Sequence, residues 1–277
     1  MMPTRPLSSL ESKLILRLEW DKQPTVTIAQ ASEILGVSSN HARQILHRLA
    51  RARWLSQITP GKYELIPAER GEYAFEDTNP LFIGSVLVEP YYFSYATAAF
   101  FYGLTTQAAS TVFIATTQPR PRRMLVREKE YRLVFQPTHK FFGWKTVNAY
   151  GSQVNMADPE KTLLDSLDHP RYVGDIPEVA TMLWLGKNSL DWDNLVDYAL
   201  RFQARALLQR LGYLVERLNL PMRESTKGRL VAGFGGKNKC YLGQPKKWGT
   251  GGLYSATWQV VDNIPAHELL AEIEVHG

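Results

Sequence analysis

The chain has 277 residues, of which 44 % are hydrophobic, and this is enough sequence for two domains with separate cores. Its formal net charge of +5 fits an anionic partner but does not identify one. The single cysteine excludes an internal disulfide and a cysteine-based zinc site, no apolar run reaches transmembrane length, and the opening residues lack the apolar core of a signal peptide, so we expect a cytoplasmic protein with no membrane partner.

Three helices are predicted at the start of the chain. The first covers residues 8–20, and the second covers residues 27–35, where a T-x-x-Q capping box opens the helix and a glycine ends it. The tight turn G-V-S then leads into a third helix over residues 39–51. This order of elements predicts a helix-turn-helix.

The third helix has one apolar and one polar face. Its apolar stripe, at helical spacing, consists of Ala42, Ile45, Leu46 and Leu49. The opposite face carries Asn, Gln and Arg, whose forked donors and acceptors match base edges in the major groove of DNA. We expect base contacts from Asn40, Arg43, Gln44 and His47. The further DNA-binding residues that we expect are Ser39, Arg48, Arg51 and Lys62.

A β-hairpin is predicted over residues 54–66. Its centre, T-P-G-K at 59–62, predicts a type II turn, because proline fixes φ and glycine accepts a positive φ. This turn would place Lys62 at the tip of a wing, against a phosphate. No acidic residue occurs between Glu33 and Glu64. A stretch without negative charge favours contact with a phosphate backbone. Residues 1–67 therefore predict a winged helix-turn-helix that binds double-stranded DNA; the alternative is a three-helix bundle with a solvated basic face.

Residues 68–277 predict a larger, mixed α/β domain, so that the whole chain is α+β. A polar connection at 68–80 precedes it. The predicted helices cover 81–88, 95–102, 159–167, 175–185, 192–202 and 204–219. The predicted strands cover 111–116, 131–136, 145–150 and 153–157. From residue 221 a basic, Gly/Lys-rich tail region begins, with β-like pieces at 229–232 and 253–260.

No pattern in the sequence predicts an enzyme. Asp158, Glu160, Lys161 and Asp165 suggest part of a nuclease site, but Glu160 and Lys161 are adjacent and point about 100° apart on a helix. Asp158 instead caps a helix that starts with proline, and Glu160 favours the positive end of that helix. The Gly-rich run before Lys237 lacks the G-K-[ST] of a P-loop. We expect no catalytic residue, no metal and no cofactor.

Two basic clusters remain. The first is an expected auxiliary surface for nucleic acid or a partner, made by Arg120, Arg122, Arg123 and Arg127. The second lies between residues 223 and 247 and has aromatic residues interleaved. The alternative for both clusters is a set of solvated loops and hairpin edges, where positive charge discourages edge pairing.

The order of these segments resembles the AbiEi family of antitoxins and autorepressors from bacterial type IV toxin–antitoxin systems, which act in phage defence. The matching pieces are G-K-Y-E-L-I-P (61–67), S-Y-A-T-A-A-F-F-Y-G-L-T (94–105), T-V-F-I-A-T (111–116), A-D-P-E-K-T-L-L-D (157–165) and R-L-G-Y-L-V-E-R-L (210–218). The fourth piece is the most specific.

The resemblance implies a protein without enzymatic activity that has two roles. The winged head would repress its own operon by binding operator inverted repeats. The C-terminal domain would antagonise a cognate toxin resembling a nucleotidyltransferase, and this need not involve a stable complex.

Two other functions stay open from the sequence. One is a winged-helix regulator whose C-terminal domain senses a small ligand, which a closed apolar pocket with a few polar groups would favour. The other is a nuclease or nucleotidyltransferase fused to a DNA-binding head, which carboxylates clustered around a metal would favour.

Overall fold

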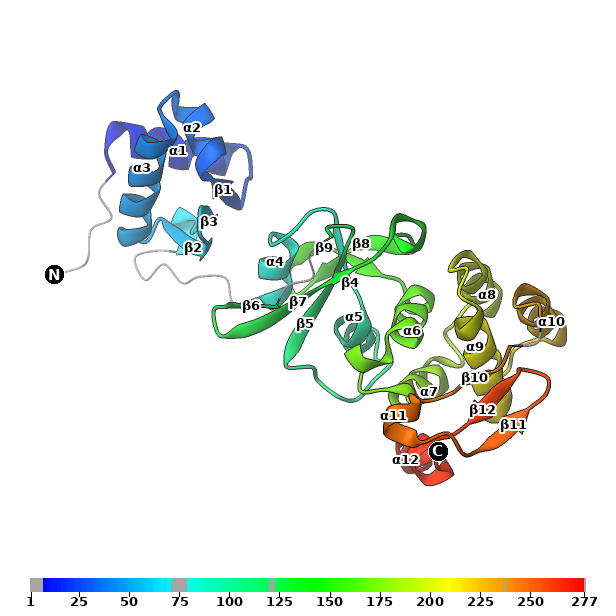
Figure 1. The fold of residues 1–277 in the computed structure, drawn as a ribbon. Coiled ribbons are helices and arrows are strands. Elements are labelled where there is room, and N and C mark those ends of the chain that lie inside the picture. Colours follow the sequence, from blue (N-terminus) through cyan, green and yellow to red (C-terminus); the bar gives the residue numbers. More distant parts are fainter. Residues whose placement is uncertain (1–6, 71–78, 120–122, 237, 277) are drawn as a thin grey trace. The chain divides into compact units, whose positions relative to one another are not determined.

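The computed structural model describes residues 7–70, 79–119, 123–236 and 238–276, which form a mixed α+β fold with several sheets (Figure 1). The chain divides into two compact units. The first unit is Met1–Leu87 with Leu125–Glu128, and the second unit is Val88–Met124 with Lys129–Gly277. The first unit thus extends past residue 67 and includes a short segment from later in the chain. In the described residues no helix is both long and apolar enough to span a bilayer.

Three helices open the first unit: α1 (Ser9–Trp20), α2 (Ile28–Leu35) and α3 (Ser39–Arg51). The local signals that predicted them are present as expected. Thr27 and Gln30 form a capping box at α2, which ends at Gly36 with a φ of 68°. The Ser38 hydroxyl caps α3 by accepting a hydrogen bond from the His41 amide at 3.3 Å.

A small antiparallel sheet completes this part of the first unit. Its strands are β1 (Thr25–Thr27), β2 (Leu55–Thr59) and β3 (Lys62–Leu65), in the order β1-β3-β2. Gly61, in the turn between β2 and β3, has a φ of 81°, as the predicted turn requires. The helices and the sheet share a core that includes Leu14, Leu18, Val26, Ile45 and Tyr63.

Two short helical segments follow: η1 (Ala68–Arg70) and α4 (Pro80–Ser85). The helix predicted over 81–88 is thus shorter than expected. Asn79 caps α4 by accepting a hydrogen bond from the Leu81 amide at 2.9 Å, and the helix ends before Val86.

A mixed six-stranded sheet forms the first half of the second unit. Its strands are β4 (Tyr91–Phe93), β5 (Thr111–Thr116), β6 (Arg123–Val126), β7 (Lys129–Phe135), β8 (Trp144–Ala149) and β9 (Ser152–Ala157). The order is β6-β7-β5-β4-β9-β8, with β5 parallel to β7 and β4 parallel to β9. The end of the β6–β7 hairpin, Leu125–Glu128, belongs to the first unit.

Helices build most of the rest of the second unit. They are α5 (Tyr95–Phe101), α6 (Pro159–Asp168), α7 (Ile176–Gly186), α8 (Trp192–Arg201), α9 (Arg205–Arg217), α10 (Glu224–Gly233), α11 (Pro245–Trp248) and α12 (Ala266–His276), with the short turns η2 (Thr138–Lys140) and η3 (Pro170–Tyr172). Helices α5 and α6 pack on each other beside the sheet, and α12 packs on α7 (Figure 1). One large core joins these helices.

The tail region differs from the prediction at residues 229–232. These residues lie in α10 and not in a strand, because Thr226 and Leu230, one helical turn apart, are both buried. The run 253–260 contains a complete strand, β11 (Leu253–Ser255), and the start of a second, β12 (Val260–Asp262). With β10 (Cys240–Tyr241) they form a small sheet in the order β10-β12-β11.

Candidate nucleic-acid interface and a buried polar network

The polar face of α3 is the main candidate interface. Ala42, Ile45, Leu46 and Leu49 are almost completely buried, so the opposite face of the helix is turned to solvent. Seven of the residues expected to bind DNA are exposed on α3: Ser39, Asn40, Arg43, Gln44, His47, Arg48 and Arg51. The helix contains no carboxylate, and its capped N-terminus adds partial positive charge.

Two contacts hold side chains of this face in position. The Arg48 Nε lies 2.8 Å from the Glu11 carboxylate of α1, while half of the Arg48 side chain remains exposed. Burial tends to raise the pKa of Glu11, but hydrogen bonds from Ser8 and Arg48 outweigh it and lower that pKa. The His47 ring meets the buried Tyr63 ring edge-on, with 6.2 Å between centroids.

Lys62 differs from the other expected DNA-binding residues. It is half-buried, and its ammonium donates a hydrogen bond to the main-chain carbonyl of Val86 at 2.5 Å. Its charge is thus used inside the first unit and does not extend freely from the turn.

The first basic cluster is not a continuous exposed patch in the described residues. Arg120 and Arg122 lie outside those residues, and the exposed Arg123 is 3.5 Å from Glu130. Arg127 lies 2.8 Å from the buried Glu64 carboxylate. Its guanidinium also donates to the Ser56 hydroxyl at 2.8 Å.

The second basic cluster is partly neutralised by ion pairs. Lys227 pairs with Glu224 at 2.6 Å, and Lys247 pairs with Asp175 at 2.9 Å. Arg229 pairs with Asp197. These pairs favour the solvated-surface interpretation for those three cations, because their charge already has a partner within the unit.

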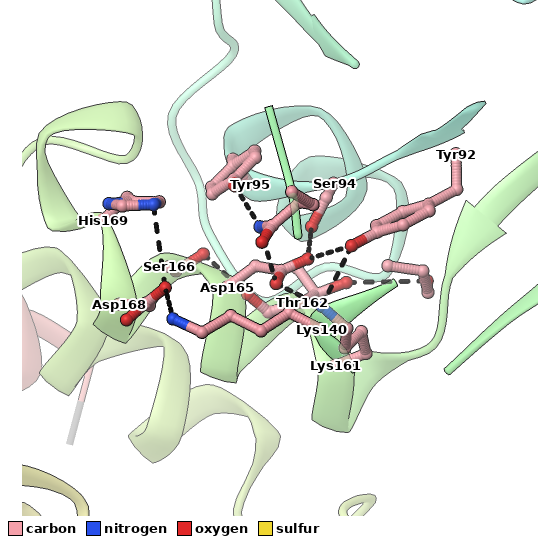
Figure 2. A network of polar contacts seen from close by, with 12 residues as sticks. Tyr92, Ser94, Tyr95, Lys140, Lys161, Thr162, Asp165, Ser166, Asp168 and His169 are labelled. Carbon is pink, nitrogen blue, oxygen red and sulfur yellow. Dashed lines mark hydrogen bonds and ion pairs between the residues drawn. The ribbon is translucent and has the colours of Figure 1, made fainter. Parts of the chain in front are cut away.

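A buried polar network lies in the second unit, centred on Asp165 of α6 (Figure 2). One oxygen of this carboxylate accepts hydrogen bonds from the hydroxyls of Tyr92 at 3.1 Å and Ser94 at 2.8 Å. The other accepts from the Gln136 amide at 3.2 Å and from the Lys161 ammonium. Side chains from β4, α6 and the residues flanking β4 and β7 therefore converge on one carboxylate.

Lys161 is completely buried beside Asp165. Its ammonium also donates to the Tyr92 hydroxyl at 2.9 Å and lies 4.7 Å from the centre of the Phe202 ring. Burial lowers the pKa of Lys161, and the Asp165 charge acts in the opposite direction. A fully buried cation that pairs with a fully buried carboxylate is the arrangement of a structural ion pair.

The other carboxylates of α6 have structural partners. Asp158 accepts hydrogen bonds from the Lys161 amide at 2.8 Å and the Tyr198 hydroxyl at 3.0 Å. Glu160 accepts from the Asp191 amide at 2.8 Å. In the described part of the chain, no group of three or more His, Cys, Asp and Glu side chains is placed to hold a metal ion.

Sequence reasoning missed the network as a unit. Lys161 and Asp165 are visible as a pair one helical turn apart, but such pairs usually lie at the surface. Tyr92, Ser94 and Gln136 are 29 to 73 residues away in sequence, so only the fold brings them to Asp165.

Comparison with known proteins gives a likeness of fold. No family model matches the chain, and no curated protein matches it. Among solved structures, the chain is similar to the Rv2827c protein of Mycobacterium tuberculosis, with a TM-score of 0.65 and 16 % sequence identity, over 98 % of this chain and 97 % of that one. At this identity the likeness supports the α+β architecture alone.

Proposed function

We propose that the protein is a sequence-specific DNA-binding transcriptional repressor whose first unit is a winged helix-turn-helix. The observation that carries this proposal is the exposed face of α3, which has forked polar and cationic side chains, no carboxylate and a buried apolar stripe behind it. Helix α3 would enter the major groove, and the β2–β3 hairpin would be the wing.

The proposed contacts divide into two kinds. Asn40, Arg43, Gln44 and His47 read base edges, and Arg51 binds phosphate. Ser39, at the start of α3, and Arg48, whose Nε is held by Glu11, contribute further contacts with the DNA backbone. Lys62 is not among them, because its ammonium is bound to the Val86 carbonyl.

A binding assay with the full-length protein and the DNA upstream of its gene tests this proposal. A variant with Asn40, Gln44 and Arg51 changed to Ala should lose specific binding. A matched variant with the exposed Lys13, Arg17 and Lys22 changed to Ala should keep it, although it removes more positive charge. Equal binding by the two variants would exclude α3 as the recognition helix.

We propose further that the repressor acts on its own operon, at inverted repeats, and is the antitoxin of a type IV toxin–antitoxin system. The support is the resemblance of five segments to the AbiEi family; the most specific one, 157–165, supplies Lys161 and Asp165 of the buried network. In this proposal the protein is cytoplasmic and not an enzyme, and it antagonises a nucleotidyltransferase-like toxin without requiring a stable complex.

The two roles can be separated with the same α3 variant. Cells that express the neighbouring toxin gene should be rescued by the wild-type chain and equally by the Asn40/Gln44/Arg51 variant, while a reporter of the operon should be repressed by the wild-type chain alone. A neighbouring gene that encodes no nucleotidyltransferase-like protein, or failure of the wild-type chain to rescue growth, would remove the antitoxin role and leave the repressor role standing.

A further inference from the structure

The second unit contains a partly open cavity of about 310 Å³. It lies between α5, the segment that leads into β5, η3 and α7, and its lining includes Ala96, Phe113, Tyr172, Glu178 and Met182. This volume falls at the lower end of the range that small-molecule sites occupy.

A buried carboxylate forms part of the wall. Glu178 of α7 is 9 % exposed, and its Oε1 accepts a hydrogen bond from the Thr105 hydroxyl at 2.5 Å. Among the described residues Glu178 forms no ion pair with a Lys, Arg or His side chain, and the like charge of Glu272 on α12 acts on it. Burial, together with the charge of Glu272, raises the pKa of Glu178, and these two effects outweigh the hydrogen bond from Thr105, which lowers it. A buried carboxylate without a cation is costly, so this wall favours a positively charged occupant.

The other walls favour a flat, organic occupant. The Phe113 and Tyr172 rings are 5.5 Å apart at 44° to each other, and Ala96 and Met182 add apolar surface. Arg171, also in the lining, is exposed; it donates to the Tyr172 hydroxyl at 2.9 Å and its guanidinium lies over the Tyr172 ring, 4.8 Å from the ring centre, so Phe113 is the aromatic wall left for an occupant. A metal ion is not favoured, because the described residues hold no group of three metal-binding side chains.

We propose that this cavity binds a small planar organic cation of the amidine or guanidinium class, whose N–H groups donate to Glu178 and whose flat body lies against Phe113. A pair of parallel N–H donors matches the two oxygens of a carboxylate and gives a charge-assisted contact. The proposal rests on the second unit alone and does not depend on DNA binding.

Calorimetric titration of the full-length protein with benzamidine, and with its neutral isostere benzamide, is the first test. Benzamidine should bind at least about 10-fold more tightly than benzamide, and Glu178→Gln should remove that preference. Glu272→Gln, which removes a nearby charge outside the cavity lining, should keep or strengthen benzamidine binding. Equal affinity for the two compounds, or benzamidine binding unchanged in Glu178→Gln, would overturn the proposal.

Methyl NMR of the wild-type protein gives a second test that does not depend on the folding of a variant. With methyl-labelled methionine, benzamidine should shift the Met182 signal, since Met182 lines the cavity, and leave Met156 unchanged, since Met156 is buried elsewhere in the second unit. A titration that leaves Met182 unshifted, or shifts both signals equally, would show that the cation does not enter this cavity.

Discussion

Gln44 and Arg51 lie on the same exposed face of α3, but their side chains have different chemistry. A glutamine amide discriminates between bases through two matched hydrogen bonds, whereas an arginine on a phosphate adds affinity for any sequence. We therefore expect Gln44→Ala to cost about 1–3 kcal/mol on the specific site and to relax specificity at one position. Arg51→Ala should weaken binding to all DNA sequences and should reduce the magnitude of the slope of log K against log salt by about 1.

These two expectations are measured by fluorescence anisotropy over a salt series, on specific and scrambled DNA, with Arg17→Ala as the control. Arg17 is an exposed arginine of α1 that pairs with Asp21 at 2.7 Å. If Arg17→Ala lowered the salt slope as much as Arg51→Ala does, the effect would reflect net charge and not a phosphate contact on α3.

Lys161 and Asp165 form a buried ion pair, for which loss of one partner costs more than loss of both. Asp165→Asn leaves the Lys161 charge without its anion and should lower the free energy of unfolding by about 3–5 kcal/mol. The double variant Lys161→Met/Asp165→Leu should lose less than the sum of its single variants. Urea unfolding of the wild type, Lys161→Met, Asp165→Leu and the double variant measures this coupling; strict additivity would show that the pair does not act as a unit.

At the scale of elements, Asp158 is the N-cap of α6. Its carboxylate accepts a hydrogen bond from the Lys161 amide, which is otherwise one of the unpaired donors at the helix start. Asp158→Ala should lower the free energy of unfolding by about 0.5–2 kcal/mol, whereas Asp158→Asn, which can still cap, should lose less. DNA binding by either folded variant should be unchanged, and loss of binding without loss of stability would contradict a structural role for Asp158.

Asp175 joins the start of α7 to α11 and should make stability depend on pH. Burial alone would raise the pKa of its carboxyl, but hydrogen bonds from Lys247, the Ile176 amide and Trp248 outweigh it and lower the pKa below the ordinary 3.8. This contribution is therefore complete well above the ordinary value of 3.8, and it is lost as the pH falls through 3.8 and then through the lowered value. Asp175→Asn should make the loss of stability between pH 5 and pH 2 shallower, in unfolding curves measured at each pH. An unchanged pH profile would contradict the shift.

The helices were predictable where their signals are local. The Thr27/Gln30 box, Gly36 and the Asp158 cap each act within four residues, and each lies at the expected helix end. The run 229–232 was misassigned because a short apolar piece fits a strand or a helix equally, and only the burial of Leu230 decides. The strand order and the Asp165 network depend on residues far apart in sequence, which periodicity does not report.

At the scale of the whole molecule, the first unit is assembled from two separated stretches of the chain. Arg127, from the second stretch, pairs with Glu64 of β3, whose side chain is only 2 % exposed. Arg127 was expected to belong to an auxiliary binding surface. Its 20 % exposure and its contact with Glu64 favour a structural role within the first unit instead.

Arg127→Met should therefore weaken DNA binding although it changes no residue of α3, because it destabilises the first unit that carries this helix. Removing this partner of a buried carboxylate should destabilise the first unit by up to about 3–5 kcal/mol, and hydrogen exchange of the α1–α3 amides should report the loss. Adding Glu64→Gln should restore much of the stability and the binding, because the buried charge is then removed as well. Arg123→Met, on the exposed part of the same hairpin, is the matched control and should change neither. If instead Arg127→Met reduced the salt slope of binding while hydrogen exchange stayed unchanged, Arg127 would be a phosphate contact, in line with the auxiliary nucleic-acid surface that is one of the two sequence-based interpretations.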